Sequence, residues 1–207
     1  MSALVGRIIG SFCALVVAGV ASADRLVNVP TARPLSTNAI RFEYLGGLNN
    51  STAEEQFVAF SVLSGLEFEV RRRIRPDENG RSTFDLGYNI LSPVASTAPG
   101  ISVGVLDGLG ETLDGRRAFI ALTFRELLDI GEVGESGDVT LGYQTGSLSG
   151  LFVGISLPFS GRTRMIVEHN GARLTSGFET NLLKGLDARL FIQDQLLLGG
   201  ISFSRKF

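Results

Sequence analysis

The stretch "LGGISFSRKF", residues 198–207, decides the fold. Ile201 and Phe203 alternate with serines, so apolar and polar side chains fall on opposite faces of an extended strand. The strand pattern continues almost to the last residue, Phe207. Because chain ends are usually frayed and solvated, a strand that reaches the terminus predicts that this terminus has a structural role.

Period-two alternation of apolar and polar side chains extends over most of the chain. In "GLEFEVRRRI", residues 65–74, Leu66, Phe68 and Val70 oppose charged side chains. Turn-forming sequences such as "DENG" and "HNG" separate the alternating runs. This pattern predicts an all-β protein of about twelve strands joined as an antiparallel meander. The alternating runs are residues 39–45, 65–74, 83–90, 100–108, 138–144, 150–157, 162–170, 172–180, 186–194 and 198–207.

Two segments leave their secondary structure open. Residues 51–63, "STAEEQFVAFSVL", begin with a Ser51 to Glu54 spacing that resembles a helix-capping box. The apolar residues that follow it, from Phe57 onward, fit a strand at least as well. Residues 123–133, "TFRELLDIGEV", could contain a helical turn within a loop.

The N-terminal segment has the three parts of a secretory signal peptide. Arg7 supplies a positive charge, residues 8–20 form an apolar run, and the small residues Ala21 and Ala23 flank Ser22. The alternative, a transmembrane helix, needs about 20 apolar residues, which is longer than this run. We therefore expect residues 1–23 to be a signal peptide cleaved after Ala23.

Alternating strands can bury their apolar faces in two ways. A soluble sandwich packs these faces together, whereas a transmembrane barrel turns them to lipid and the polar faces to the lumen. Here the polar faces combine small residues with charges of both signs, which suits a narrow lumen with paired charges. We therefore expect residues 38–207 to form a transmembrane antiparallel meander β-barrel in the outer membrane, surrounded by its lipids. The expected lumen charges are Glu67, Glu69, Arg71, Asp85, Arg162, Arg164, Glu168, Arg173, Glu179 and Arg189.

The last strand carries a further feature of outer-membrane proteins. In a meander barrel this strand must pair with the first strand, because a closed barrel has no edges. Ile201, Phe203 and Phe207 resemble the C-terminal signal of bacterial outer-membrane proteins, although Arg205 stands where an apolar residue is usual. We expect the barrel-assembly machinery, which reads this signal, to be a partner.

The composition argues against several classes of function. The net charge of -2 gives no basic excess for nucleic acid. The single histidine is His169, and the single cysteine, Cys13, lies in the apolar run of the signal peptide. We therefore expect no cofactor and no zinc or thiol chemistry. Asp107, Glu111 and Asp114 suggest calcium, but their spacing does not fit an EF-hand, so a solvated acidic loop is favoured.

A lipase-like outer-membrane hydrolase is the enzymatic alternative. It would need His169 together with Glu168 and a serine such as Ser156 or Ser160. The alternation, however, places His169 on the apolar face, opposite to the polar faces that carry Glu168 and Ser156. The sequence therefore favours an interfacial histidine at a strand end and a protein that is not an enzyme.

Several short motifs follow one another along the chain. "LVNVPTARPLSTNAIRFEY" places Asn28, Pro30, Thr31, Ala32 and Arg33 before the first strand. "GLEFEVRRR", "TFDLGYNILSPVASTAPGISVGVLDGLGE", "GLFVGISLPF" and "MIVEHNG" follow in that order. Together they resemble the YjbH-type family of outer-membrane proteins, which is linked to exopolysaccharide biosynthesis. The resemblance implies a short member with a single barrel, and a polysaccharide or export proteins as partners.

Residues 24–37 form an extended N-terminal segment before the barrel. Pro30 and Pro34 restrict the backbone and remove two hydrogen-bond donors, so this segment is not a central strand. It is either a plug that enters the barrel, with Arg33 meeting a lumen carboxylate, or an ordinary periplasmic linker.

These observations predict a non-enzymatic outer-membrane β-barrel with a role in exopolysaccharide export or cell-surface organisation. Paired charges across the lumen argue against a wide, open pore. A small porin or solute channel is the alternative function, and a soluble periplasmic barrel is the alternative structure.

Overall fold

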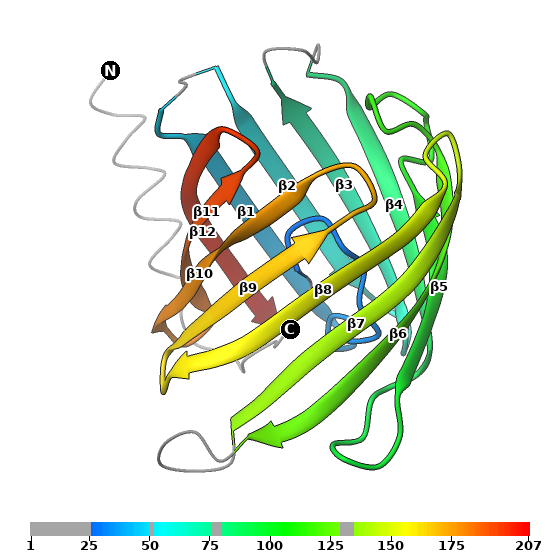
Figure 1. Ribbon diagram of the computed structural model, residues 1–207, viewed down its shortest axis with the longest axis vertical. Helices are drawn as coiled ribbons and strands as arrows, with labels where there is room; N and C mark the ends of the chain where they lie inside the picture. Colours follow the sequence, from blue (N-terminus) through cyan, green and yellow to red (C-terminus); the bar gives the residue numbers. More distant parts are fainter. Residues whose placement is uncertain (1–25, 50–51, 76–79, 129–134) are drawn as a thin grey trace.

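The computed structural model describes residues 26–49, 52–75, 80–128 and 135–207, which form one closed barrel (Figure 1). Its strands are antiparallel, and each pairs with its neighbours in the chain. The strands are β1 (Ala39–Gly47), β2 (Glu54–Ser61), β3 (Leu66–Ile74), β4 (Ser82–Leu91), β5 (Gly100–Leu106), β6 (Arg117–Leu128), β7 (Glu135–Gly146), β8 (Gly150–Ser160), β9 (Thr163–His169), β10 (Leu174–Leu183), β11 (Leu186–Gln193) and β12 (Leu196–Lys206). The prediction of an all-β meander barrel of about twelve strands is confirmed.

The barrel closes where β1 pairs with β12. The register runs from Ala39 opposite Lys206 to Gly47 opposite Leu198. The backbone N–H of Phe207 also donates to the carbonyl of Asn38 at 2.8 Å. The first strand is therefore joined to the last strand along the whole length of β1, and the closed sheet has no edge.

Both segments that the sequence left open contain strands. Residues 54–61 form β2, with Phe57 facing inward and Phe60 facing outward. Phe60 packs against Phe68 of β3 on the outer surface, with ring centroids 5.1 Å apart. In the other segment, residues 123–128 belong to β6. The rest of the expected helical turn lies outside the described residues.

The barrel is apolar outside and polar inside. Along β1, Phe42 and Tyr44 are exposed on the outer face, whereas Arg41 and Glu43 are buried on the inner face. The other strands continue an outer apolar belt that includes Phe60, Val70, Leu86, Ile120, Leu122, Phe124, Leu141, Leu190 and Ile201. A soluble protein hides such side chains from water, so this reversed arrangement is that of a transmembrane barrel.

The two ends of the barrel differ in the loops that they carry. We call the end where β1 begins and β12 finishes the terminal end; it also holds the β2–β3 and β4–β5 connections. The other end, called the distal end, holds the β3–β4 and β5–β6 loops. Among the described residues, no helix is long and apolar enough to cross a membrane.

Candidate functional site

The N-terminal segment lies inside the barrel. Figure 1 shows this blue segment within the ring of strands. Val29 and Ala32 are fully buried, and Leu26, Val27 and Leu35 are nearly so. Leu26, Val27 and Val29 share one apolar cluster with inward side chains from several strands, including Phe57, Phe119, Phe152 and Phe191. The lumen is therefore filled by this segment and by the aromatic side chains around it.

Glu168 of β9 holds the deepest part of the segment. Its buried carboxylate accepts hydrogen bonds from the Asn28 backbone N–H at 2.8 Å and the Val29 backbone N–H at 3.0 Å. The Asn28 side-chain amide also donates to it at 2.8 Å. Arg73 of β3 donates to the side-chain oxygen of Asn28 at 2.6 Å. Asn28 is thus hydrogen-bonded to side chains on opposite sides of the barrel, on β3 and on β9. Hydrogen bonds to charged groups are stronger than those between neutral groups.

The following residues bind the wall formed by β4, β5 and β6. The Ala32 N–H donates to the Thr123 hydroxyl at 2.8 Å, and the Asn89 amide donates to the Ala32 carbonyl at 2.5 Å. The Ser102 hydroxyl donates to the Thr31 carbonyl at 3.1 Å. Extended backbone rich in proline forms no ladder of its own. Lumen side chains therefore provide hydrogen-bond partners for the backbone of this segment.

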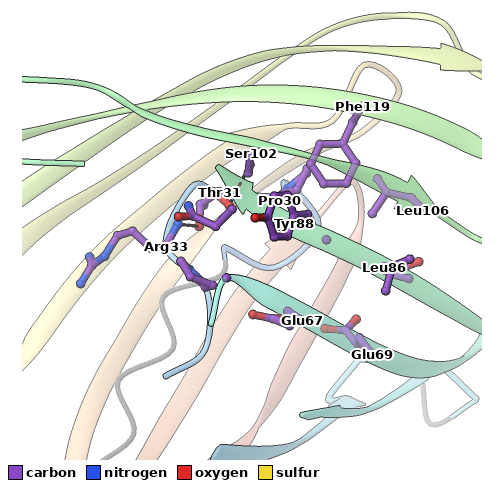
Figure 2. A pocket seen from close by; sticks show the side chains of 15 residues that line it. Pro30, Thr31, Arg33, Glu67, Glu69, Leu86, Tyr88, Ser102, Leu106 and Phe119 are labelled. Carbon is purple, nitrogen blue, oxygen red and sulfur yellow. Dashed lines mark hydrogen bonds between the residues drawn. The ribbon is translucent and has the colours of Figure 1, made fainter. Parts of the chain in front are cut away.

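Arg33 extends toward another part of the lumen. Figure 2 shows its side chain pointing away from Glu67 and Glu69. It forms a hydrogen-bonded ion pair with Asp138 of β7. Asp138 also lies 3.0 Å from Arg125 of β6 and 3.5 Å from Arg164 of β9. One carboxylate thus meets three guanidinium groups, one of which belongs to the N-terminal segment.

Glycines of the wall leave room for the segment. A Cβ atom on Gly154 of β8 would lie 2.1 Å from Leu26 Cδ1 and 3.2 Å from Val29 Cγ1. A Cβ atom on Gly100 of β5 would lie 2.8 Å from the Cβ of Ala32. The wall and the segment are therefore complementary in shape at these two places.

Other lumen charges brace neighbouring strands. Arg71 lies 3.0 Å from Glu69 and 2.5 Å from Asp85. Arg189 of β11 lies 2.6 Å from Glu43 of β1 and 2.5 Å from Glu179 of β10. Each guanidinium joins carboxylates from different strands, so these contacts stiffen the wall.

The β5–β6 loop contributes buried charge at the distal end. Asp114 is buried, with ion-pair distances of 3.7 Å to Arg73, 3.8 Å to Arg117 and 3.5 Å to Arg173. The expected solvated acidic loop is therefore wrong for Asp114, and it is also wrong for Asp107, which is buried. The loop turns inward because arginines of the lumen attract its carboxylate.

Asp107 is also buried and organises the start of the same loop. Its carboxylate accepts the Thr83 hydroxyl at 2.6 Å and the Glu111 and Thr112 backbone N–H groups at 2.9 and 2.8 Å. Burial raises the pKa of Asp107, but these hydrogen bonds prevail and hold the pKa below its usual value. Glu111 instead pairs with the exposed Arg81 at 2.5 Å. Among the described residues, no group of acidic or histidine side chains could hold a metal ion.

The structure places the expected lumen residues with one exception. Glu67, Glu69, Arg71, Asp85, Arg164, Glu168, Glu179 and Arg189 lie on the inner faces of their strands, and Arg173 reaches inward from the β9–β10 loop. Arg162 lies in the turn between β8 and β9 and is exposed, so its assignment to the lumen is wrong. A turn ends the alternation, and the face of a turn residue cannot be extrapolated from the strand.

The remaining predicted residues fall at the two ends of the chain. Pro30 and Thr31 line a narrow crevice between the segment and the wall (Figure 2). Phe203 lies opposite Phe42 in the β1–β12 register, Ile201 is exposed on the outer face, and the Phe207 side chain is 70% exposed. Ala21 and Ala23, with the rest of residues 1–23, lie outside the described residues.

The residues considered for a hydrolase are not brought together. His169 is exposed at the distal end of β9, where it faces outward, opposite Val153. Ser156 is buried on the inner face, and Ser160 lies at the other end of the same hairpin, opposite Thr163. No hydrogen bond of a catalytic triad can form across the sheet between these groups.

Several lumen residues were not among those expected. Asp138 lies on the polar face of a recognised alternating run, so the pattern could have identified it. Glu55 lies in the segment whose secondary structure was left open, and it is buried 3.1 Å from Arg73. Asp114 lies in a loop, and no periodic signal marks its inward position.

Comparison with known proteins identifies the class of fold. No protein-family profile matches the chain, and no curated protein resembles it in sequence. Among solved structures, the barrel is similar to a KdgM porin, with a TM-score of 0.50 and 9% sequence identity. The similarity covers 82% of this chain and 99% of the porin. At this identity it shows the fold alone, a porin-like 12-stranded barrel, and no comparison supports the YjbH-type resemblance.

Proposed function

We propose that this protein is a small outer-membrane channel whose lumen is closed by its own N-terminal segment, residues 26–35. The observation that carries the proposal is the position of this segment, which fills a porin-like barrel through buried contacts on several strands. The apolar outer belt and the similarity to a porin support a membrane channel. The arginine and carboxylate pairs of the lumen support a narrow passage.

Closure of the lumen depends on the carboxylate of Glu168, which holds the N-terminal segment in place. Its hydrogen bonds with Asn28 and Val29 have a charged acceptor, which a glutamine replaces only in part. A hydrogen bond to a charged group contributes about 1.5–3 kcal/mol to stability. Since each 1.4 kcal/mol corresponds to about a tenfold change in an equilibrium, Glu168→Gln should raise the open fraction about tenfold.

Single-channel recording in planar bilayers tests the proposal. The natural chain should conduct rarely, deletion of residues 26–35 should give persistent conductance, and Glu168→Gln should give frequent openings. Glu126→Gln, on the outer face of β6, is the matched control and should behave like the natural chain. The proposal fails if the natural chain conducts as strongly and as unselectively as the deletion, or if neither variant conducts.

A second candidate function is a YjbH-type role in exopolysaccharide export or cell-surface organisation. The observation in its favour is that Asn28, Thr31, Ala32 and Arg33, which carry the resemblance, make the lumen contacts described above. The porin-like fold favours the channel over this role. Loss of secreted polysaccharide in a deletion strain, restored by the gene, would support the role, and unchanged secretion would exclude it.

A further inference from the structure

The β5–β6 loop, residues 107–116, crosses the lumen at the distal end. Its buried Asp114 lies 3.7 Å from Arg73 of β3 and 3.5 Å from Arg173 of the β9–β10 loop. In the closed ring of strands, β3 and β9 lie halfway round from each other. A carboxylate within ion-pair distance of arginines from both of these walls lies over the lumen between them. The loop therefore spans the distal mouth of the barrel.

Contacts at both ends of the loop fix its position. At its start, the Asp107 carboxylate accepts hydrogen bonds from the Thr83 hydroxyl of β4 and the Thr112 hydroxyl of the loop, each at 2.6 Å. Just after its end, Arg117 donates to the side-chain oxygen of Gln144 on β7 at 3.1 Å. These contacts join the loop to the walls formed by β4 and β7, so the loop has one defined position over the lumen.

Arg73 connects this loop to the N-terminal segment. Its three guanidinium nitrogens have three different partners. Nη2 donates to the Asn28 side-chain oxygen at 2.6 Å, Nη1 lies 3.7 Å from the Asp114 carboxylate, and Nε lies 3.1 Å from the Glu55 carboxylate of β2. The guanidinium is planar and rigid, so a partner that orients one nitrogen also orients the other two. The segment and the loop therefore support each other's contact with Arg73, and they do not compete for it.

We propose that the β5–β6 loop narrows the distal mouth of the lumen and is coupled to the N-terminal segment through Arg73, which positions both. Movement of the loop removes the partner that orients Arg73 toward Asn28, and departure of the segment removes the partner that orients it toward Asp114. Such coupling is reciprocal, so each element stabilises the closed position of the other. The narrowing concerns transport and rests on the proposed function, whereas the coupling does not.

Maleimide labelling of Val29→Cys measures exposure of the segment in the full chain, folded in detergent micelles. Val29 is fully buried and follows Asn28 directly. Asp114→Asn should raise the labelling rate about fivefold, the lower end of typical coupling between two sites. It should do so although the ion-pair partners of Asp114 in the described part of the chain belong to the barrel. Glu111→Gln is the matched control in the same loop, because its carboxylate pairs with the exposed Arg81, and it should leave the rate unchanged.

Arg73→Lys tests whether the coupling passes through this guanidinium. Lysine keeps the positive charge but has one nitrogen in place of three. With Arg73→Lys present, Asp114→Asn should therefore change the labelling rate by less than about twofold, as independent sites do. A fivefold effect that persists in this background would overturn the role of Arg73. Equal labelling rates with Asp114→Asn and with Glu111→Gln would overturn the coupling itself.

Thr112→Val decides the question if Asp114→Asn does not fold. It removes the hydroxyl that donates to Asp107 and leaves the buried arginines with their carboxylate. The loop should loosen, and labelling of Val29→Cys should rise about twofold, because a neutral hydrogen bond contributes little net stability. An unchanged rate would contradict the coupling.

Conductance separates this inference from the channel proposal. When residues 26–35 are deleted, Asp114→Asn should enlarge the single-channel conductance, because the loop still lies over the distal mouth. An unchanged conductance would refute the narrowing. Coupled labelling without conductance in any variant would end the channel proposal and leave the coupling, whereas conductance of the deletion with uncoupled labelling would do the reverse.

Discussion

Gly154 connects the wall of the barrel to the segment inside it. On the inner face of β8, the space next to Gly154 is occupied by Leu26 and Val29. A side chain at position 154 would displace them. Gly87 of β4 also faces inward, but a Cβ atom there would have no neighbour within 4 Å. The two glycines therefore allow the same substitution to be compared with and without contact to the segment.

Gly154→Ala should loosen the N-terminal segment. Overpacking typically costs about 1–3 kcal/mol, so exposure of the segment should rise about tenfold. Val29, which is fully buried, can be replaced by cysteine as a reporter, because the chain's one natural cysteine is Cys13. Maleimide should label Val29→Cys faster when Gly154→Ala is also present.

Gly87→Ala is the control for that experiment and should leave the labelling rate unchanged. Equal rates of maleimide labelling of Val29→Cys in the presence of Gly154→Ala and of Gly87→Ala would contradict the close fit between β8 and the segment. Rapid labelling of the reporter in an otherwise natural chain would contradict the buried position of the segment itself.

At the scale of the element, the β1–β12 pairing determines whether the barrel closes. A Cβ atom on Gly200 of β12 would lie 1.8 Å from the Tyr44 carbonyl oxygen and 2.8 Å from the Tyr44 carbonyl carbon of β1. These neighbours are backbone atoms, so they can move only if the two strands separate. Glycine at position 200 is thus a condition for the close approach of the first and last strands.

Gly200→Ala should weaken closure by an amount on the order of 3 kcal/mol, in the range of strongly destabilising substitutions. For a domain of this size that corresponds to a fall of roughly 6–12 °C in melting temperature. A gel that separates folded from boiled barrel, run after heating in steps, measures the shift. Gly87→Ala should melt within about 2 °C of the natural chain, and an equal fall in both variants would contradict the closure argument.

The elements were well predicted from the sequence because a strand's two faces are a local property. Residues 65–74 show this in β3, where Glu69, Arg71 and Arg73 face inward as the alternation requires. The alternation gives no information about residues that lie beyond the end of a strand. Arg162 in a turn and Asp114 in a loop were therefore misplaced, since tertiary contacts decide their positions.

At the scale of the whole molecule, the apolar belt implies a lipid environment. Leu141 lies on the outer face of β7 and is 48% exposed, whereas Thr145 lies on the same face nearer the distal end. In a membrane barrel a charge near the bilayer midplane costs about 2–4 kcal/mol, and a charge near the interface costs about 0–1 kcal/mol. The loss of stability that a charge causes at each of these two positions therefore indicates how deep that position lies in the bilayer.

Leu141→Arg should reduce the free energy of unfolding in lipid vesicles by about 2–4 kcal/mol, and Thr145→Arg by less than about 1 kcal/mol. Urea titration followed by far-UV circular dichroism measures both. If the barrel were a soluble periplasmic protein, Leu141→Arg would not change the free energy of unfolding. The protein would also be released by cell lysis without detergent. That result would refute the membrane assignment.

The sequence by itself determined that the protein is a meander of strands with one apolar and one polar face, because period-two alternation and turn residues act over a few positions. It also pointed to Arg33 and a lumen carboxylate, while leaving a plug and a linker equally open. Only the tertiary structure decided that residues 26–35 lie inside the barrel. The contacts that hold them join residues far apart in the chain, with 140 positions between Asn28 and Glu168 and 105 between Arg33 and Asp138. No local pattern specifies such contacts, because they exist only after the barrel has closed and brought its polar faces together.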